Sequence, residues 1–344
     1  MKHTVKFLAL TLALLMILPL SLFACNKADE DQNNDETAPA LDQELEIKIY
    51  ALNGTTSLGM AQMIAKEKDN TDTMNYKISL HAAADAITGA ITTGECAIAA
   101  LPTNAAANLY KKSEGKIKLL ALNTLGVLYL LDTTGEIKSL EDLSGKTVYL
   151  PGAGSNPEFI TAALLEAAGL KVGEDVTLDT TSYNSPDALQ GAIIAGKAAI
   201  AVLPEPKVSV VTTQAKNVTV ALDLTAEWEK INGKNTLVQG CLVVNTKFAE
   251  EHPAEVAQFL KDYEASVNFI KEGSDDAINM IVDAGILPKA AIAKKALPKC
   301  NICFIAGDDM KPVMTVFCEK MNAVNKKAVA AVPDDGFYYV TNEK

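Results

Sequence analysis

Two glycine-containing segments carry hydroxyl and amide groups that could hold a small polar molecule. Residues 53–57 (NGTTS) and 152–156 (GAGSN) each precede a stretch with helical periodicity. Backbone N–H groups at a helix start, together with such side chains, can bind an anion or the acceptor edge of a heterocycle. The alternative is that Ser and Thr only cap the helices that follow. The predicted ligand contacts in these segments are Asn53, Gly54, Thr55, Thr56, Ser57, Gly154, Ser155 and Asn156.

Three polar residues follow two strand-like runs that both end in Leu-Pro. Thr103 and Asn104 follow the first run, and Glu205 follows the second. At strand ends these side chains would face a cleft, so we expect all three to contact a ligand. A carboxylate at Glu205 would favour a ligand with hydrogen-bond donors or a positive charge and would oppose a bare anion. The alternative for Glu205 is a solvated acid in a loop.

Three ring-bearing residues are further candidates for ligand contacts. His81 ends a strand-like run, Tyr129 lies in the apolar run Val-Leu-Tyr-Leu, and Tyr183 precedes the helical stretch at Asp187. Each could reach the cleft, although structural packing is the alternative for His81 and Tyr129. The only tryptophan, Trp228, lies among charged residues, and we expect it to be exposed and outside the site.

The six cysteines do not indicate a metal or redox site. Cys300 and Cys303 have CxxC spacing, but zinc needs four ligands and Cys318 adds only one more. Buried thiols, or one disulfide among these three residues, are the alternatives. We therefore predict no metal and no cofactor.

The segments that carry these candidates belong to an internal repeat. Residues 85–102 (DAITGAITTGECAIAALP) match residues 187–204 (DALQGAIIAGKAAIAVLP) position by position. Both copies predict a short helix and then an apolar strand, and both follow a strand, a Gly-rich turn and a helix. This alternation predicts two α/β lobes with parallel strands, and ligands of such sheets bind at the carboxyl ends of the strands. The lobes would therefore face each other across a cleft.

The N-terminus has the features of an export signal. Lys2 and Lys6 precede an apolar run at residues 7–24, which ends directly before Cys25. Leucine, a small residue and then cysteine resemble the bacterial lipobox; the alternative is a plain secretory signal with an incidental cysteine. We predict a lipoprotein signal peptide at residues 1–24, lipidation at Cys25 and an acidic tether at residues 25–44. No other segment reaches the length and apolarity of a membrane span.

The charge balance excludes several kinds of partner. The chain has 344 residues, with 43 Asp and Glu against 31 Lys and Arg, a net charge of −12, and no arginine. So acidic a chain is a poor candidate for binding nucleic acid. Without arginine it cannot clamp a carboxylate or sulfonate through a bidentate guanidinium group.

An ordered set of five motifs runs along the chain. The motifs are NGTTSLG (53–59), ADAITGAITTGE (84–95), AALPTN (99–104), PGAGSNP (151–157) and VQGCLVVNTKF (238–248). This set resembles the substrate-binding lipoproteins of ABC importers, in particular the nitrate/sulfonate/taurine branch, which includes binders of thiamine precursors and riboflavin.

The resemblance implies an α/β type II periplasmic-binding-protein-like fold, two-lobed with a ligand cleft between the lobes and chain crossings near Asp132 and Leu237. One lobe would comprise residues 45–131 and 238–344, with helices near 254–271 and 308–326 packing mainly on it. The other lobe would comprise residues 132–237.

The resemblance also implies a function. We expect a monomeric, lipid-anchored binding protein on the outer face of the cytoplasmic membrane, which delivers a small organic ligand to ABC permease subunits. The expected ligand is a small heterocycle such as a vitamin precursor, or else a sulfonate- or nitrate-type anion. The expected protein is not an enzyme. The alternative is an enzyme on the same fold, with thiamine-pyrimidine or menaquinone-precursor chemistry, although the clustered cysteine motif of the pyrimidine synthases is absent.

Overall fold

The computed structural model describes residues 41–340, which belong to one compact unit. The predicted signal peptide, Cys25 and most of the predicted tether lie outside the described residues. Within residues 41–340, no helix combines the length and the apolarity needed to cross a membrane.

The first part of the described chain alternates strands and helices as the repeat predicts. The strand β1 pairs in parallel with both β2 and β3, which is the pairing expected for consecutive βαβ units. The elements are β1 (Ile47–Leu52), α1 (Thr55–Leu58), α2 (Ala61–Lys68), β2 (Tyr76–His81), α3 (Ala84–Thr93), β3 (Ile98–Pro102), α4 (Thr103–Lys112) and β4 (Ile117–Leu125).

The middle of the chain repeats this alternation in a second sheet. Here β6 pairs in parallel with β7 and β8, as β1 does with β2 and β3. The elements are β5 (Leu128–Asp132), the 3-10 helix η1 (Glu141–Leu143), β6 (Thr147–Tyr149), α5 (Asn156–Ala167), β7 (Thr177–Asp179), α6 (Pro186–Ile194), β8 (Ile200–Pro204), α7 (Lys207–Gln214), β9 (Thr219–Asp223) and α8 (Leu224–Asn232).

The last part of the chain returns to the first sheet. The strand β10 lies between β3 and β4 and is antiparallel to both. The elements are β10 (Val238–Asn245), α9 (Thr246–Glu251), α10 (Pro253–Lys271), α11 (Asp275–Asp283), α12 (Ala290–Ala296), η2 (Leu297–Lys299), β11 (Ile302–Ala306), η3 (Gly307–Asp309), α13 (Met310–Val324) and η4 (Asp335–Phe337).

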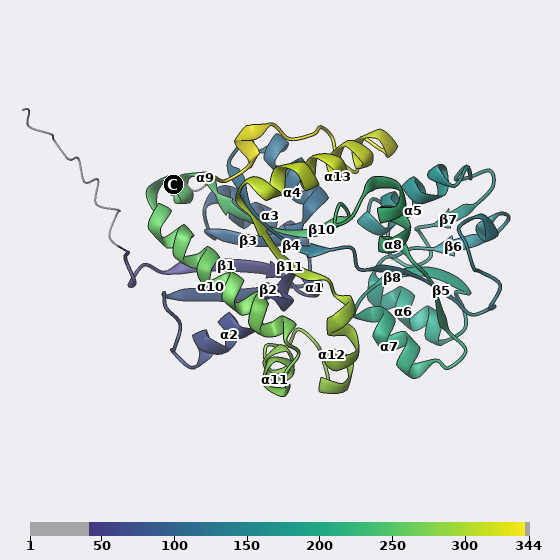
Figure 1. Cartoon of the computed structure of the whole chain (residues 1–344), viewed down its shortest axis with the longest axis horizontal. Coiled ribbons are helices and arrows are strands. Elements are labelled where there is room, and N and C mark those ends of the chain that lie inside the picture. Colours follow the sequence, from purple (N-terminus) through teal and green to yellow (C-terminus); the bar gives the residue numbers. More distant parts are fainter. Residues whose placement is uncertain (1–40, 341–344) are drawn as a thin grey trace, which may run out of the picture. The chain divides into compact units, whose positions relative to one another are not determined.

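The two sheets have matching strand orders. Sheet A is ordered β11-β4-β10-β3-β1-β2 and sheet B is ordered β7-β6-β8-β5-β9. We call the parts built on them lobe I and lobe II (Figure 1). In each lobe the strand beside the repeated trio, β10 or β5, is antiparallel and comes directly after the chain has changed sheets. The predicted fold class, α/β with two lobes, is therefore confirmed.

The chain changes sheets at two connections, the second of which contains α8. The first lies between Leu125 and Leu128, and the second between Asp223 and Val238. Gly126 lies in the first connection, where a Cβ atom would come within 2.8 Å of the Leu237 side chain in the second. The two connections therefore pack against each other. The predicted limits of the lobes, at residues 131/132 and 237/238, remain a prediction.

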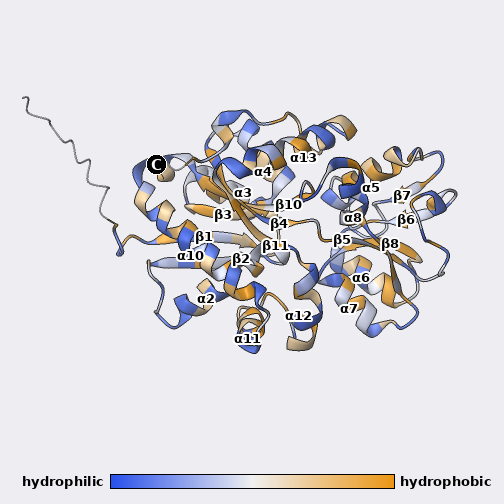
Figure 2. Cartoon of the chain, viewed as in Figure 1, coloured by the Kyte–Doolittle hydropathy of each residue, from blue (hydrophilic) through white to orange (hydrophobic). Residues whose placement is uncertain are grey.

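Alternate residues of β3 face two different hydrophobic clusters. Ala99 and Leu101 contribute to the cluster that includes α3, α4 and α13, whereas Ile98 and Ala100 contribute to the one that includes α2, α10 and α11. This is the period-two alternation of a strand with both faces covered. In Figure 2 the strands are largely hydrophobic, whereas the helices around them contain both hydrophobic and hydrophilic residues.

Trp228 is buried, so the prediction that it is exposed was wrong. Only 1% of its surface is exposed, its Nε1 donates to Thr236 Oγ1 at 3.0 Å, and its ring lies 6.3 Å from that of Phe317 in α13. The charged residues beside it in sequence, Glu227 and Lys230, lie on other sides of α8. Neighbours in sequence therefore do not predict exposure within a helix.

The C-terminal helices contact both lobes. The long helix α10 packs on α2 and β11 of lobe I, as expected, but α13 packs against α5 of lobe II as well as β10. The prediction that these helices belong mainly to the first lobe is therefore too narrow for α13. The short helix α12 likewise packs against α7 of lobe II.

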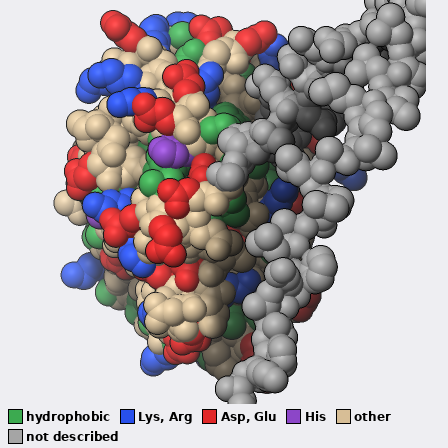
Figure 3. Space-filling model, turned by 90° about the vertical axis from the view of Figure 1, so that its left-hand side faces the viewer, with side chains coloured by type: hydrophobic (Ala, Val, Ile, Leu, Met, Phe, Trp, Pro, Cys, Tyr) green, Lys and Arg blue, Asp and Glu red, His purple; other side chains and the backbone are tan. Residues whose placement is uncertain are grey.

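The surface is rich in charge of both signs. On the face shown in Figure 3, Asp and Glu side chains lie interspersed with lysines. Like-charge repulsion among the acids is thereby reduced locally, although the chain as a whole carries −12.

Candidate functional site

A cavity of about 460 Å³ lies between the two lobes. We call it the inner chamber. Lobe I contributes the loop after β1 and the start of α4, and lobe II contributes the starts of α5, α6 and α7. The lining segments thus lie at the carboxyl ends of β1, β3 and β8 and near that of β6, where α/β sheets bind ligands.

The inner chamber brings together most of the polar loop residues predicted from the sequence. Their role in binding a ligand remains a prediction. Ser57, His81, Thr103, Tyr129 and Tyr183 do not line the chamber. The predicted residues that do line it are Asn53, Gly54, Thr55, Thr56, Asn104, Gly154, Ser155, Asn156 and Glu205.

In the loop after β1, hydrogen bonds inside the loop occupy two of the three hydroxyls. Ser57 Oγ donates to the Gly54 carbonyl at 3.0 Å and accepts from the Gly54 amide at 3.3 Å, and this residue is fully buried. Thr56 Oγ1 donates to the Leu52 carbonyl at 2.8 Å. Gly54 has a φ of 133°, which strongly favours glycine. Thr55 is therefore the hydroxyl of this loop with the most freedom to meet a ligand.

In the loop before α5, one side-chain amide oxygen lacks a partner. Ser155 Oγ donates to the Gly152 carbonyl at 2.9 Å, and the Gly154 amide donates to Glu158 Oε2 at 2.5 Å. Asn156 Oδ1 is buried but has no hydrogen bond to any described residue. Buried polar atoms normally have a partner. A ligand in the inner chamber that carries an N–H or O–H group could supply it.

The residues after the two Leu-Pro strand ends are arranged differently. Thr103 is fully buried, and its Oγ1 donates to the Val238 carbonyl at 2.6 Å rather than facing the chamber. Glu205 lines the chamber but is only 1% exposed; its Oε2 accepts from the Ser209 amide and its Oε1 from the Ser209 hydroxyl, both at 3.0 Å. Burial raises the pKa of Glu205, although the bonds from Ser209 oppose this effect.

The three ring-bearing candidates lie among structural neighbours outside the inner chamber. The Tyr129 hydroxyl donates to the Lys299 carbonyl at 3.4 Å, and the Tyr183 ring lies 5.7 Å from that of Tyr149. The His81 ring lies 4.5 Å from that of Tyr50. Each ring packs against a residue of another strand, helix or loop, and the position of a residue in the sequence does not reveal such a contact.

Two residues that line the inner chamber were not among the principal sequence candidates. Lys207 opens α7 and pairs with Asp187, and Gln239 accepts from the Val127 amide at 2.6 Å. The internal repeat carried a signal for Lys207, because it aligns this residue with Ala105, which also lines the chamber. Lys207 is the one cation among the residues that line it.

The five cysteines within residues 41–340 are buried free thiols. The sequence left open whether Cys300, Cys303 and Cys318 are buried thiols or include one disulfide. In the structure all three are buried thiols, and no disulfide joins them. Burial raises the pKa of Cys303 and of Cys318 to about 12, which keeps both thiols protonated and poorly nucleophilic. In the described part of the chain, no group of three or more His, Cys, Asp or Glu could hold a metal ion.

Two α/β lobes of matching strand order around a ligand-sized cavity define the class of periplasmic-binding-protein folds. Several solved structures share this fold. An ABC transporter structure from Parabacteroides distasonis shares 25% identity with a TM-score of 0.71, covering 87% of this chain and 99% of its own. The periplasmic aliphatic sulphonate binding protein of Escherichia coli shares 14% identity with a TM-score of 0.70, covering 87% and 93%. The alkanesulfonate-binding protein of Xanthomonas axonopodis pv. citri, bound to MOPS, shares 14% with a TM-score of 0.63, covering 86% and 96%.

The sequence comparisons indicate the same group of proteins. A family model described as NMT1/THI5 like matches residues 114–277. A Bacillus subtilis protein described as binding aliphatic sulfonates is 39% identical over 64 residues, which is 18% of this chain and 19% of that protein. The recognition made from the sequence is confirmed at this level: residues 114–277 are similar to the NMT1/THI5-like family, and the chain has the fold of the ABC-transporter binding proteins named above.

Proposed function

We propose that this protein is the lipid-anchored solute-binding component of an ABC import system. The observation that carries the proposal is the inner chamber, which both lobes line with the matching loops of an internal repeat. A ligand held by both lobes would stabilise their closed arrangement, and a permease could recognise that arrangement. The solved structures of the same fold named above support this role.

The ligand that we propose is a small organic molecule, in the first place a heterocycle with hydrogen-bond donors, such as a vitamin precursor. The unpartnered Asn156 Oδ1 and the carboxylate of Glu205 both suit donor groups on the ligand. A sulfonate- or nitrate-type anion is the second class, because several helix starts meet at the chamber. The pairing of Lys207 with Asp187 reduces the positive charge available to such an anion.

A binding screen of the purified protein tests the proposed function. Thermal unfolding is measured with nitrate, taurine and alkanesulfonates in one group, and thiamine pyrimidines, riboflavin and amino acids in the other. A ligand at 100 times its dissociation constant adds about 2.7 kcal/mol to the free energy of unfolding, which such a scan detects. A shift with one group assigns the ligand class, whereas no shift with either contradicts the proposed ligand.

A substitution in the chamber tests the role of Glu205 in binding. Glu205→Gln is expected to weaken a donor-bearing ligand by about 1.5–3 kcal/mol, the range for a hydrogen bond to a charged group. Glu319→Gln, at an exposed position of α13, is the matched control. Equal affinities for the two variants would remove Glu205 from the site.

Enzyme activity on the same fold is the second candidate, and the description of the matching family model is its support. The residues that line the inner chamber include neither cysteine nor histidine, and Glu205 and Lys207 each have a partner within lobe II. We therefore expect bound ligand to be recovered unchanged after incubation with the purified protein. Chemical turnover of a bound thiamine pyrimidine, followed by mass spectrometry, would support the enzyme instead.

The proposed anchor depends on Cys25. Cys25→Ala is expected to move the protein from the membrane fraction to the soluble exported fraction. An unchanged distribution would contradict lipid attachment at this residue.

A further inference from the structure

The two lobes are joined in different ways at α13 and at α12, which lie at opposite edges of the junction in Figure 1. At α13, Phe317 of this helix and Phe159 of α5 belong to one hydrophobic cluster that extends through both lobes. At α12, Ala296 belongs to a cluster of lobe I, whereas Val211 of the facing helix α7 belongs to a separate cluster of lobe II. The junction is therefore a shared core at α13 and a contact between two separate cores at α12.

A lysine makes the contact between α12 and α7. Lys295 of α12 donates to the hydroxyls of Thr212 and Thr213, both at 2.9 Å. It also donates to the Ser209 carbonyl at 3.5 Å. The two hydroxyls donate their own hydrogens to the carbonyls of Val208 and Ser209 within α7, at 2.8 and 2.6 Å, so towards Lys295 they act as acceptors. The three N–H groups of the ammonium thus meet three oxygens of lobe II. We call this contact the Lys295 latch.

The Lys295 latch is built to open. Its acceptors are uncharged, and Lys295 and Thr213 are both exposed, so water can replace these hydrogen bonds when the lobes separate. Separation at α13 would instead bring the carbon surface around Phe317 into contact with water. The lobes therefore separate more easily at α12 than at α13.

The latch lies beside a route from solvent to the inner chamber. A second cavity, of about 670 Å³, lies between α7 and residues 286–292, and its lining includes the exposed residues Asp187, Gln214 and Lys289. Gln214 directly follows Thr213 of the latch. The second cavity is continuous with the inner chamber, because both are lined by Leu52, Asn53, Gly54, Pro186, Pro206 and Lys207.

We propose that Lys295 gates the inner chamber: the latch holds the lobes together at α12 with or without a ligand, and a ligand enters or leaves when the latch opens. This inference rests on the proposed function. Lys295 lines neither the inner chamber nor the second cavity, so it stabilises the closed ligand-free protein and the closed complex alike. It therefore sets the rates of binding and release and leaves the affinity unchanged.

Pulsed electron paramagnetic resonance on the ligand-free protein tests the latch. Spin labels are attached at Asn279→Cys in α11 of lobe I and at Lys216→Cys shortly after α7 in lobe II, both exposed positions. The cysteines within residues 41–340 are buried and Cys25→Ala removes the remaining one, so only the introduced thiols react. Lys295→Met is expected to raise the ratio of open (long) to closed (short) distances about tenfold, as expected for the loss of hydrogen bonds from a charged group.

Lys294→Met is the matched control. It removes the same charge from the same helix, but Lys294 pairs with Asp275 of lobe I, at 2.7 Å, and does not reach lobe II. Equal distance distributions for Lys295→Met and Lys294→Met overturn the inference.

Binding kinetics test the gate itself. A dye at Lys216→Cys reports stopped-flow mixing with the compound of the screening panel that binds, taurine or a thiamine pyrimidine for example. Lys295→Met is expected to raise the association and dissociation rates together, each about tenfold, with the dissociation constant changed less than threefold. A weaker affinity with an unchanged association rate overturns the gate, because a residue that only supports the site or contacts the ligand behaves in that way.

A substitution on the other lobe keeps the test decisive if Lys295→Met does not fold. Thr213→Val removes one acceptor of the latch and is expected to shift the distances in the same direction, by a smaller factor. In the double variant it should add nothing to Lys295→Met, because the two residues act through one contact. Additive shifts overturn the inference. If no compound of the panel binds, the proposed ligand is contradicted, whereas the distances in the ligand-free protein still decide whether the latch exists.

Discussion

The antiparallel ladder of β5 and β8 in lobe II has a buried carboxylate at each end. Asp132 is paired with Ile200 at the end away from the cleft, and Glu205 follows Pro204 at the end that faces it. Each is only 1% exposed. Although both have almost no exposed surface, the pKa of Asp132 is lowered and that of Glu205 is raised.

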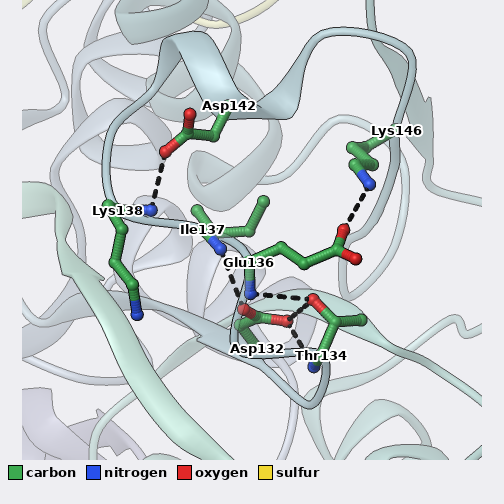
Figure 4. Close-up of polar contacts among 7 residues, drawn as sticks. All are labelled: Asp132, Thr134, Glu136, Ile137, Lys138, Asp142 and Lys146. Atoms are coloured by element: carbon green, nitrogen blue, oxygen red, sulfur yellow. Dashed lines mark hydrogen bonds and ion pairs between the residues drawn. The ribbon is translucent and has the colours of Figure 1, made fainter.

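The difference in pKa comes from the depth at which each carboxylate lies and from the donors around it. Burial alone would raise the pKa of Asp132, but bonds from the Thr134 hydroxyl and amide, both at 2.7 Å, and from the Ile137 amide at 3.1 Å outweigh it (Figure 4). Glu205 accepts from Ser209 alone, and burial dominates. A carboxylate saturated with donors holds a turn together, whereas one with unused lone pairs beside a cavity can still accept from a ligand.

The largest change in the free energy of unfolding is expected at Asp132, the carboxylate that is saturated with donors. Asp132→Asn should lower the free energy of unfolding at pH 7 by about 2–3 kcal/mol, because it weakens bonds to a charged acceptor and loses the bond from Ile137. Urea denaturation followed by circular dichroism measures this. Because the pKa is lowered in the folded state, the stabilisation is complete above the ordinary pKa of aspartate, about 4, and is lost as the pH falls further. Asp308→Asn, at an exposed position, is the control; an equal effect there would remove the contrast.

A smaller change in the free energy of unfolding is expected at Glu205, at the end of the β5–β8 ladder that faces the cleft. Ser209→Ala removes one of the donors to Glu205 and should cost about 1–2 kcal/mol at neutral pH. The same denaturation assay measures it, and the cost should shrink at acid pH. A loss as large as that from Asp132→Asn would show that the cleft carboxylate is as structural as the distal one.

The two carboxylates should also differ in the sign of their pH dependence. Since the folded-state pKa of Glu205 is raised, its favourable contribution is present below the ordinary glutamate pKa, about 4.3, and is lost as the pH rises through the folded value. Relative to Glu205→Gln, the wild-type protein should therefore lose stability as the pH rises. Thermal melts from pH 4 to 8 test this, and a parallel pH profile for the two proteins would contradict the raised pKa.

The smallest effect is expected at the exposed ion pair beside Asp132. Lys146 Nζ lies 2.6 Å from Glu136 Oε2, but both side chains are substantially exposed (Figure 4). Lys146→Met should change the free energy of unfolding by less than any of the substitutions above, and this change should vanish in 1 M salt. A larger, salt-independent change would mean that the turn depends on this pair as well as on Asp132.

The repeated core of the fold was predictable because its signals are local. Periodicity and the glycines that end helices, such as Gly94 with φ of 80° and Gly196 with φ of 71°, specify strand, turn and helix without reference to distant residues. The position of β10 between β3 and β4 was not predicted, because pairing between strands far apart in sequence leaves no local pattern. For the same reason, the contact of α13 with lobe II and the burial of Trp228 were missed.

The candidate site was predictable at the level of loops rather than of side chains. The Gly-rich segments do reach the cavity, since they follow parallel strands whose carboxyl ends share one edge. Thr103 and Ser57 turn away because backbone acceptors at Val238 and Gly54 take their hydroxyls. The spacing of Glu205 and Ser209, one helical turn, was a usable signal that the carboxylate would be occupied.

The location of β10 has a consequence for the order in which the chain can fold. Sheet B is built from one uninterrupted stretch, residues 128–223, so it can form as soon as that stretch has been synthesised. In sheet A, β3 and β4 are not neighbours, and the fully buried β10 must insert between them. Until residues 238–245 arrive, both strands have unpaired edges, which are prone to aggregation. Lobe I, although it begins first in the sequence, is therefore expected to be the last part of the protein to fold.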